Sequence, residues 1–302
     1  MVWAPLYAVN MNKETLYELC NNSPMEKLNL KLCKYLLGVH RKSTNAAVRG
    51  EIGRYPLLIS MLNLAARYHE RIQSLEHSSL VKMSCSDIFV HAYNASWPSV
   101  MVELCRNFCG TLSLKATLEQ IYRESWSSYI DSCQGKLRLY AKFKKSFELE
   151  NYLLQFPTHI RRNFSKLRIS AHNLAIETGR YSKPHATPIE KRICFYCKQV
   201  ETEFHFIFNC PLYYVERKSL YDQLSNILSI EIIPSDDLFY IIMTGLHGDL
   251  EVGRIVCEHI NACFNIRSEM LCNKRENDIY QRTKSAITRS GRVSKRPVIL
   301  DL

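Results

Sequence analysis

The sequence of 302 residues predicts a mainly α-helical protein, in which a helical bundle is followed by a small cysteine-rich module and a basic tail. Apolar residues recur at helical spacing through the first third of the chain, three cysteines and a histidine gather within 17 residues near position 200, and the end of the chain is polar and basic. These features divide the chain into a helical region at 1–134, a basic segment at 135–192, the module with following helices at 193–272, and a disordered tail at 273–302.

The first helix has signals at both ends. Ser23-Pro24-Met25-Glu26 is a capping box, with Ser23 at the N-cap, Glu26 three residues later, and a proline where its missing N–H costs nothing. Apolar residues then recur at helical spacing until Gly38, a residue that readily adopts the left-handed backbone conformation with which helices end. The spacing therefore predicts a helix that begins after Ser23 and ends before Gly38.

Three more helices complete the predicted bundle. One begins after Pro56, one runs from Ser99 to Cys109 and stops at Gly110, and one carries an apolar stripe from Leu114 to Tyr129. Four helices joined by short connections are typical of a bundle.

The middle of the chain changes character. From Lys136 to Lys144 apolar and mostly basic residues alternate, which predicts a strand with one basic face and leaves a helix as the alternative. A basic helix is expected from Thr158 to Arg168, and the prolines within Ser182–Pro188 indicate a linker.

The last helices are predicted from their starts. One opens at Pro211, another follows Ser235 as N-cap with Asp236 and Asp237 in its first turn, and a third spans roughly 250–271.

Composition excludes several classes of protein. The longest mostly apolar stretch, 55–68, is shorter than the roughly 20 residues that a membrane helix needs. The N-terminus lacks the features of a secretory signal. We therefore expect no membrane partner and an intracellular protein, nuclear or cytoplasmic, whose 12 cysteines are thiols or metal ligands.

The cysteine-rich module carries the strongest chemical signal. Cys194, Cys197, His205 and Cys210 follow the pattern C-x2-C-x7-H-x4-C. A C-x2-C pair brings two thiolates to one ion, and a second pair completes a tetrahedron without an open position for water. We therefore predict a zinc-binding module with structural Zn²⁺, in which the neighbouring phenylalanines form a small core; the alternative is four unrelated buried side chains.

A basic segment precedes this module. Residues 136–192 hold 13 Lys and Arg against 4 Asp and Glu, so this one segment holds most of the excess positive charge of a chain whose net charge is +11. Such density predicts contacts with the phosphates of RNA or DNA, and Tyr140, Phe164 and Tyr181 are candidates for stacking on bases. The alternative is a solvated basic face whose aromatics turn inward. The candidate nucleic-acid-binding residues are Lys136, Arg138, Lys142, Lys144, Lys145, Arg161, Arg162, Lys166, Arg168 and Arg180.

Four segments resemble the C-terminal part of non-LTR retrotransposon reverse transcriptases. They are Lys31-Leu-Cys-Lys-Tyr-Leu-Leu-Gly-Val39, Gly50-Glu-Ile-Gly-Arg-Tyr-Pro56, Arg168-Ile-Ser-Ala-His-Asn-Leu-Ala-Ile-Glu-Thr-Gly-Arg180 and Glu203-Phe-His-Phe-Ile-Phe-Asn-Cys-Pro211. The resemblance covers roughly residues 25–270 and is most specific in the last segment. It implies the region after the polymerase thumb, ending in a zinc module that helps to hold template RNA or target DNA.

The catalytic signature of those polymerases is missing. It consists of an aromatic residue, any residue and two aspartates that hold magnesium, whereas the one Asp pair, Asp236-Asp237, follows Pro234-Ser235 and comes after the cysteine cluster. We therefore expect a nucleic-acid-binding segment that is not an enzyme. The alternative is a structural or protein-interaction remnant of a mobile element with no role on nucleic acid.

Overall fold

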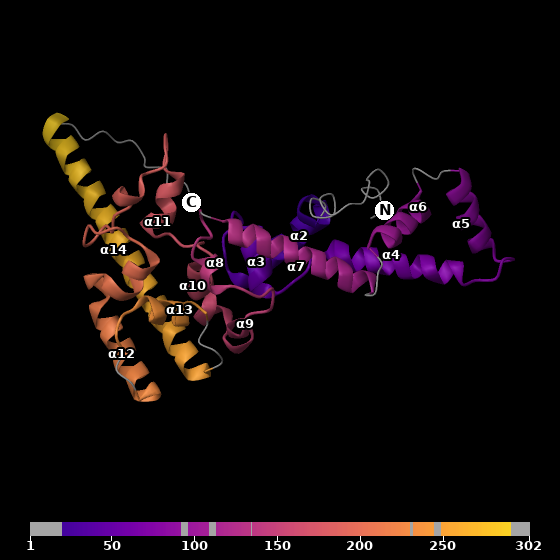
Figure 1. Cartoon of the computed structure of the whole chain (residues 1–302). Coiled ribbons are helices and arrows are strands. Elements are labelled where there is room, and N and C mark those ends of the chain that lie inside the picture. Colours follow the sequence, from indigo (N-terminus) through magenta and orange to yellow (C-terminus); the bar gives the residue numbers. More distant parts are fainter. Residues whose placement is uncertain are drawn as a thin grey trace.

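The computed structural model describes residues 20–91, 96–108, 113–133, 135–229, 232–244 and 249–290, with side chains as far as residue 276. Within these ranges the chain is helical and contains two isolated β-bridges but no strand, which confirms the mainly α prediction. The helices of the N-terminal half extend to one side of the molecule, and the C-terminal half gathers around the long helix α14 (Figure 1). The N-terminal helices are α2 (Pro24–Leu37), α3 (Asn45–Ile52), α4 (Leu57–Gln73), α5 (Leu80–His91), α6 (Trp97–Phe108) and α7 (Leu114–Ser132).

The four predicted helices of the bundle are present as α2, α4, α6 and α7. The Ser23 hydroxyl accepts a hydrogen bond from the Glu26 amide at 3.3 Å, and Gly38 ends α2 with a φ of 65°. α6 begins two residues before the expected start, and its predicted end at Cys109 lies outside the described residues. Caps and apolar stripes thus located these helices because both act within a few residues along the chain.

The first core lies among α2, α3, α4, α6 and α7. Two buried side chains tie α3 to later parts of the chain: the indole N–H of Trp126 donates to the Ala46 carbonyl at 2.9 Å, and the Tyr140 hydroxyl donates to the Ala47 carbonyl at 3.2 Å. The sequence did not predict α3, which is short and buries two charged residues, Arg49 and Glu51, so its pattern does not look amphipathic.

Gly53 ends α3 in the left-handed region, with a φ of 61°. A Cβ at this position would lie 2.3 Å from the backbone nitrogen of Leu149, in the segment that bridges to Ile52. We expect Gly53→Ala to lower the free energy of unfolding by more than about 1 kcal/mol, because strain and a backbone clash add. Urea unfolding measures this, with Gly135→Ala as the control because an added Cβ there meets nothing closer than 4.0 Å. Equal losses for the two variants would contradict the expectation.

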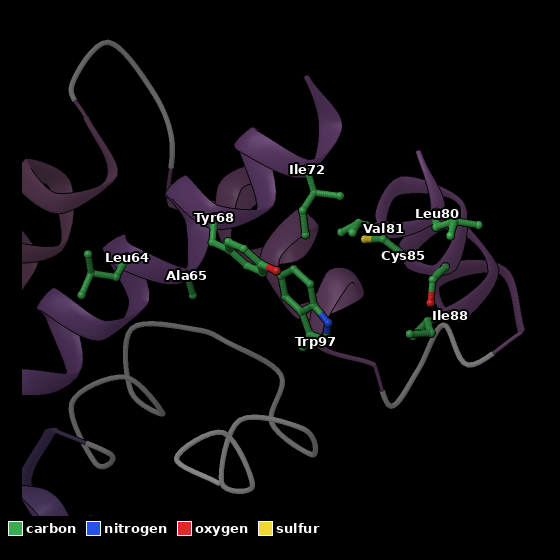
Figure 2. Close-up of a pocket in the computed structure, with 10 residues that line it drawn as sticks. Leu64, Ala65, Tyr68, Ile72, Leu80, Val81, Cys85, Ile88 and Trp97 are labelled. Atoms are coloured by element: carbon green, nitrogen blue, oxygen red, sulfur yellow. The ribbon is translucent and has the colours of Figure 1, made fainter. Parts of the chain in front are cut away.

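The second unpredicted helix, α5, packs loosely at the far end of the molecule. Its one fully buried residue is Cys85, and it faces α4 and α6 across an apolar hollow of about 610 Å³ (Figure 2). Tyr68 and Trp97 stack there with ring centroids 5.9 Å apart. Because most apolar side chains of α5 remain partly exposed, its sequence carries little of the periodicity that marks a packed helix.

The second core surrounds α14, against which α10 and α12 pack. The expected end of the last helix near residue 271 and the disordered tail from 273 are wrong as far as residue 290, because α14 continues to Ser290; the rest of the tail lies outside the described residues. The elements of this half are α8 (Tyr140–Phe143), α9 (Asn151–Gln155), α10 (Thr158–Arg168), α11 (Ala175–Thr178), η3 (Gly179–Tyr181), η4 (Ile189–Lys191), η5 (His205–Asn209), η6 (Pro211–Tyr213), α12 (Tyr214–Leu228), α13 (Asp236–Met243) and α14 (Leu250–Ser290).

The basic segment 135–192 is not a separate layer. Leu137 and Tyr140 lie in the first core, whereas Phe164 and Leu167 lie in the second. The strand expected over 136–144 is absent; the residues there form a turn and α8, as the helical alternative required. Leu137 and Tyr140, three residues apart, are buried together, which is the spacing of a helical turn.

Candidate metal centre and basic groove

A tight hairpin positions the first two predicted ligands, Cys194 and Cys197. Ile193 and Val200 form an antiparallel bridge, and the Cys194 amide donates to the Gln199 carbonyl at 2.7 Å. The turn closes with Lys198 at a φ of 65° and its amide donating to the Cys194 carbonyl at 3.1 Å. Both thiols are therefore held at one end of the hairpin, as a C-x2-C pair requires.

Of the other two ligands, His205 begins a short π-helical turn, η5, and Cys210 directly follows its end. The Cys210 amide donates to the His205 carbonyl at 2.9 Å, and the His205 amide donates to the Thr202 hydroxyl at 3.0 Å. Cys210 is the N-cap residue of the turn that Pro211 opens and that leads into α12. The last ligand therefore lies at the entry to the helix that follows the metal site.

The four ligand atoms lie within 4.8 Å of one another. The sulfurs of Cys194 and Cys210 are 3.8 Å apart, and the Cys197 sulfur is 3.3 Å from His205 Nε2. A tetrahedral ion with metal–sulfur distances of about 2.3 Å has sulfur–sulfur edges of about 3.8 Å, so the spacing suits a shared metal ion and is far too long for a disulfide. The sequence thus identified side chains that the fold brings together.

Cys194 and Cys210 are buried and share a hydrogen bond. The hydrogen bond from Cys210 lowers the pKa of the Cys194 thiol, and the same contact raises the pKa of Cys210. Two thiols in such contact do not ionise independently, and a positive ion between them favours the thiolate form of both. This donor set can hold a metal ion in a closed site.

The phenylalanines around His205 pack inward, as predicted. Phe206 and Phe208 are buried, and the Phe206 ring lies 4.9 Å from the ring of Tyr213 and 4.6 Å from that of Phe264, centroid to centroid. The metal cluster is consequently part of the second core, and loss of its geometry acts on α12 and α14 directly.

Two of the ten basic candidates are wrong. Arg168 is 1% exposed and forms ion pairs with Glu51 and Glu150 at 3.0 Å, and the buried Lys144 also pairs with Glu150. Neither side chain can contact a phosphate in this fold. Both stand in the most basic part of the sequence, so charge density alone did not separate a buried ion pair from a binding surface.

Two further candidates, Arg138 and Arg180, are engaged in ion pairs at the edge of the metal module. Arg138 bonds to Glu177 at 3.2 Å and to Glu203 at 2.9 Å, and Arg180 bonds to Glu177 at 3.1 Å. Their charges are balanced locally, so they support the fold of this region.

Lys142, Lys145 and Arg161 lie partly or fully at the surface. Lys142 donates to the Tyr240 hydroxyl, Lys145 is 68% exposed in its side chain, and Arg161 bonds to backbone carbonyls at the end of α9 and α2.

The three remaining candidates, Lys136, Arg162 and Lys166, line a basic groove. Two adjoining hollows of about 650 and 800 Å³ form this groove and share His40, Ala171, His172 and Thr178 in their walls. We name them the Tyr181 hollow and the Arg162 hollow. The cations that line the groove are Arg41, Lys42, Lys136, Arg162, Lys166 and Lys183.

One carboxylate, Glu177, lines the groove, and Arg138 and Arg180 already neutralise it. The cations are crowded: burial and then the charge of Arg162 lower the pKa of Lys166, and burial and then the charge of Lys136 lower the pKa of Lys34, which bonds to the Arg41 carbonyl. The groove therefore has an excess of positive charge that an anionic ligand would relieve.

Sequence reasoning missed the loop that supplies Arg41 and Lys42. His40-Arg41-Lys42 comes shortly after Gly38, where α2 ends in the left-handed backbone conformation. The two cations and the histidine of this loop were the signal that could have marked it as part of a basic surface. Nothing along the chain shows that this loop meets Lys183, which lies in the expected linker.

The wall of the groove rests on the metal module. His172 lies 3.3 Å from Glu203 through its Nε2 atom, and Glu201 accepts the Ala175 amide at 2.5 Å and the Ile176 amide, through its carbonyl, at 3.2 Å. Glu201 also pairs with Arg267 of α14. Groove and metal cluster thus share one supporting segment.

Comparison with known proteins gave no relative: no family model, curated protein or solved structure matches this chain. Among the described helices, none combines the length and the apolar character needed to cross a membrane.

Proposed function

We propose that this protein is a zinc-stabilised nucleic-acid-binding segment, similar to the C-terminal region of non-LTR retrotransposon reverse transcriptases, and that it is not itself an enzyme. The observation that carries the proposal is the basic groove, where six Lys or Arg side chains face one neutralised carboxylate. Phosphodiesters of RNA or DNA are the anions that such a cationic surface suits.

Zinc is the metal that the donors favour. Three thiolates and one imidazole within 4.8 Å form a soft, tetrahedral set that leaves no position for water. The ion would fold the module and carry no reaction. The described cysteines are free of disulfides, which supports an intracellular location, nuclear or cytoplasmic.

The Asp pair supports the same conclusion about catalysis. Asp236 and Asp237 occupy the first turn of α13, where the Ser235 hydroxyl accepts the Leu238 amide at 3.1 Å. Carboxylates in this position stabilise the helix N-terminus. Their local role supports a binding protein without a polymerase centre.

One observation favours the second candidate, a structural or protein-interaction helical protein without a nucleic-acid role. Tyr140 and Phe164, expected to stack on bases, are buried, and Arg168 and Lys144 are in buried ion pairs. Part of the basic segment therefore serves the fold. A role in the fold does not account for the cations that line the groove, because they do not face carboxylates of their own there.

A binding titration at two salt concentrations separates the two functions. We expect labelled single-stranded RNA or DNA to bind with a steep salt dependence, and the double variant Lys42→Glu with Lys166→Glu to bind roughly tenfold or more weakly, with a salt slope smaller by about two. The matched control is Lys27→Glu with Lys218→Glu, exposed lysines on α2 and α12 outside the groove. Equal binding by both double variants, or no salt-dependent binding by the unaltered protein, would sink the proposal.

A further inference from the structure

The Tyr181 hollow contains polar atoms that the fold leaves without partners. Among the described buried side chains, the hydroxyls of Ser43 and Ser170 and the Oε2 atom of Glu177 have no hydrogen-bond partner, and all three residues line this hollow. Ser43 is 4% exposed, Ser170 is 1% exposed and Glu177 is 2% exposed. Buried polar groups without partners are costly, so a cluster of them beside one hollow indicates a ligand that supplies those partners.

Ser170 also has an unusual backbone conformation. Its φ is 53°, in the left-handed region, at the exit of α10. A residue other than glycine is held there at some cost in free energy, and such costs gather at functional sites. Glycine would adopt this conformation more easily, so the fold alone gives no reason for a serine at this position.

An exposed aromatic ring stands beside these groups. Tyr181 is 67% exposed, and the Lys136 ammonium lies 5.9 Å from the centre of its ring. Of the three aromatic residues predicted to stack on bases, it is the exposed one, since Tyr140 and Phe164 are buried. Lys42, Lys136 and Lys183 line the same hollow and are suited to a phosphate.

We propose that the Tyr181 hollow is a subsite for one unpaired nucleotide of the strand that lies in the basic groove. The lysines form ion pairs with the phosphate of this nucleotide, and the Tyr181 ring stacks on its base. The two serine hydroxyls and Glu177 Oε2 form hydrogen bonds with polar atoms of its sugar or base. This inference rests on the proposed nucleic-acid function and adds to it the preference for a single strand, because a paired base cannot reach Tyr181 from within a duplex.

The test compares a labelled 12-nucleotide single strand with a 12-base-pair duplex at one salt concentration. The unaltered protein should bind the single strand more tightly. Tyr181→Ala should weaken that binding roughly fivefold to a hundredfold, and Ser170→Gly roughly twofold to tenfold, with little change for the duplex. Ser170→Gly suits the left-handed backbone, so its melting temperature should not fall.

Two matched controls remove the same groups elsewhere. Ser229→Gly acts on an exposed serine with the same φ of 53° at the end of α12, and Tyr214→Ala removes a tyrosine that is 62% exposed. Both should bind like the unaltered protein. If the groove binds nucleic acid but Ser170→Gly and Tyr181→Ala match their controls, or if duplex and single strand bind equally, the subsite is overturned while the proposed function stands. If the unaltered protein binds neither probe, both proposals fall.

Discussion

Removal of the metal by a chelator is expected to unfold the second core and to abolish nucleic-acid binding with it. Structural zinc contributes apparent binding free energies of about 10–16 kcal/mol in small zinc modules, which matches or exceeds the roughly 5–15 kcal/mol by which most domains are stable. Cys194 and Cys210 are buried within the core formed with α12 and α14. Loss of the metal therefore cannot remain a local change. Metal analysis should find one zinc per chain, and circular dichroism should report the loss of helix after chelation.

A serine variant isolates the role of coordination. Cys197 is the one partly exposed ligand, so Cys197→Ser leaves almost no cavity and any loss of stability follows from the metal. We expect this variant to lose zinc and melt at a much lower temperature. Cys272→Ser, which changes an exposed thiol of α14, is the control and should keep both. Full zinc content and an unchanged melting temperature in Cys197→Ser would contradict the metal centre.

The sequence was most informative where structure is determined locally. The metal ligands lie within 17 residues, and the caps of α2 and α13 act over three residues, so spacing alone predicted them. α3 and α5 were missed for opposite reasons. α3 buries charged side chains, and α5 exposes apolar ones, so neither shows the amphipathic pattern that marks a helix.

The groove was only half predictable because tertiary packing assembles it. Lys136, Arg162 and Lys166 came from the charge of one segment, whereas Arg41 and Lys42 belong to a loop more than 90 residues earlier in the chain. The same charge count misplaced Arg168. A local pattern reports how many cations a segment holds, and only the fold decides which of them meet carboxylates.

Arg168 joins the two cores through a buried network of ionised groups. Its guanidinium bonds to both carboxylate oxygens of Glu51 at 3.0 Å, to Glu150 at 3.0 Å and to the Met243 carbonyl. Burial alone would lower its pKa, but Glu51 and Glu150 raise that pKa above its ordinary value, so the side chain stays charged. Tyr152 donates a further hydrogen bond to Glu51 at 2.6 Å. Glu51 lies on α3, which contributes Ala47 and Val48 to the first core, and Met243 belongs to the second core, so one side chain links both.

Arg168→Met is therefore expected to lower the free energy of unfolding by about 3–5 kcal/mol, because it leaves Glu51 buried without its cation. The double variant Arg168→Met with Glu51→Gln should recover much of this loss, since a neutral amide is far less costly to bury than an unpaired carboxylate. Arg71→Met, at an exposed arginine of α4, controls for the loss of one positive charge. Urea unfolding of Arg168→Met, of Glu51→Gln and of the double variant, with Arg71→Met as the control, measures the coupling between Arg168 and Glu51. If the double variant is as unstable as the sum of the two single changes, the pair does not act as a unit and the link between the cores lies elsewhere.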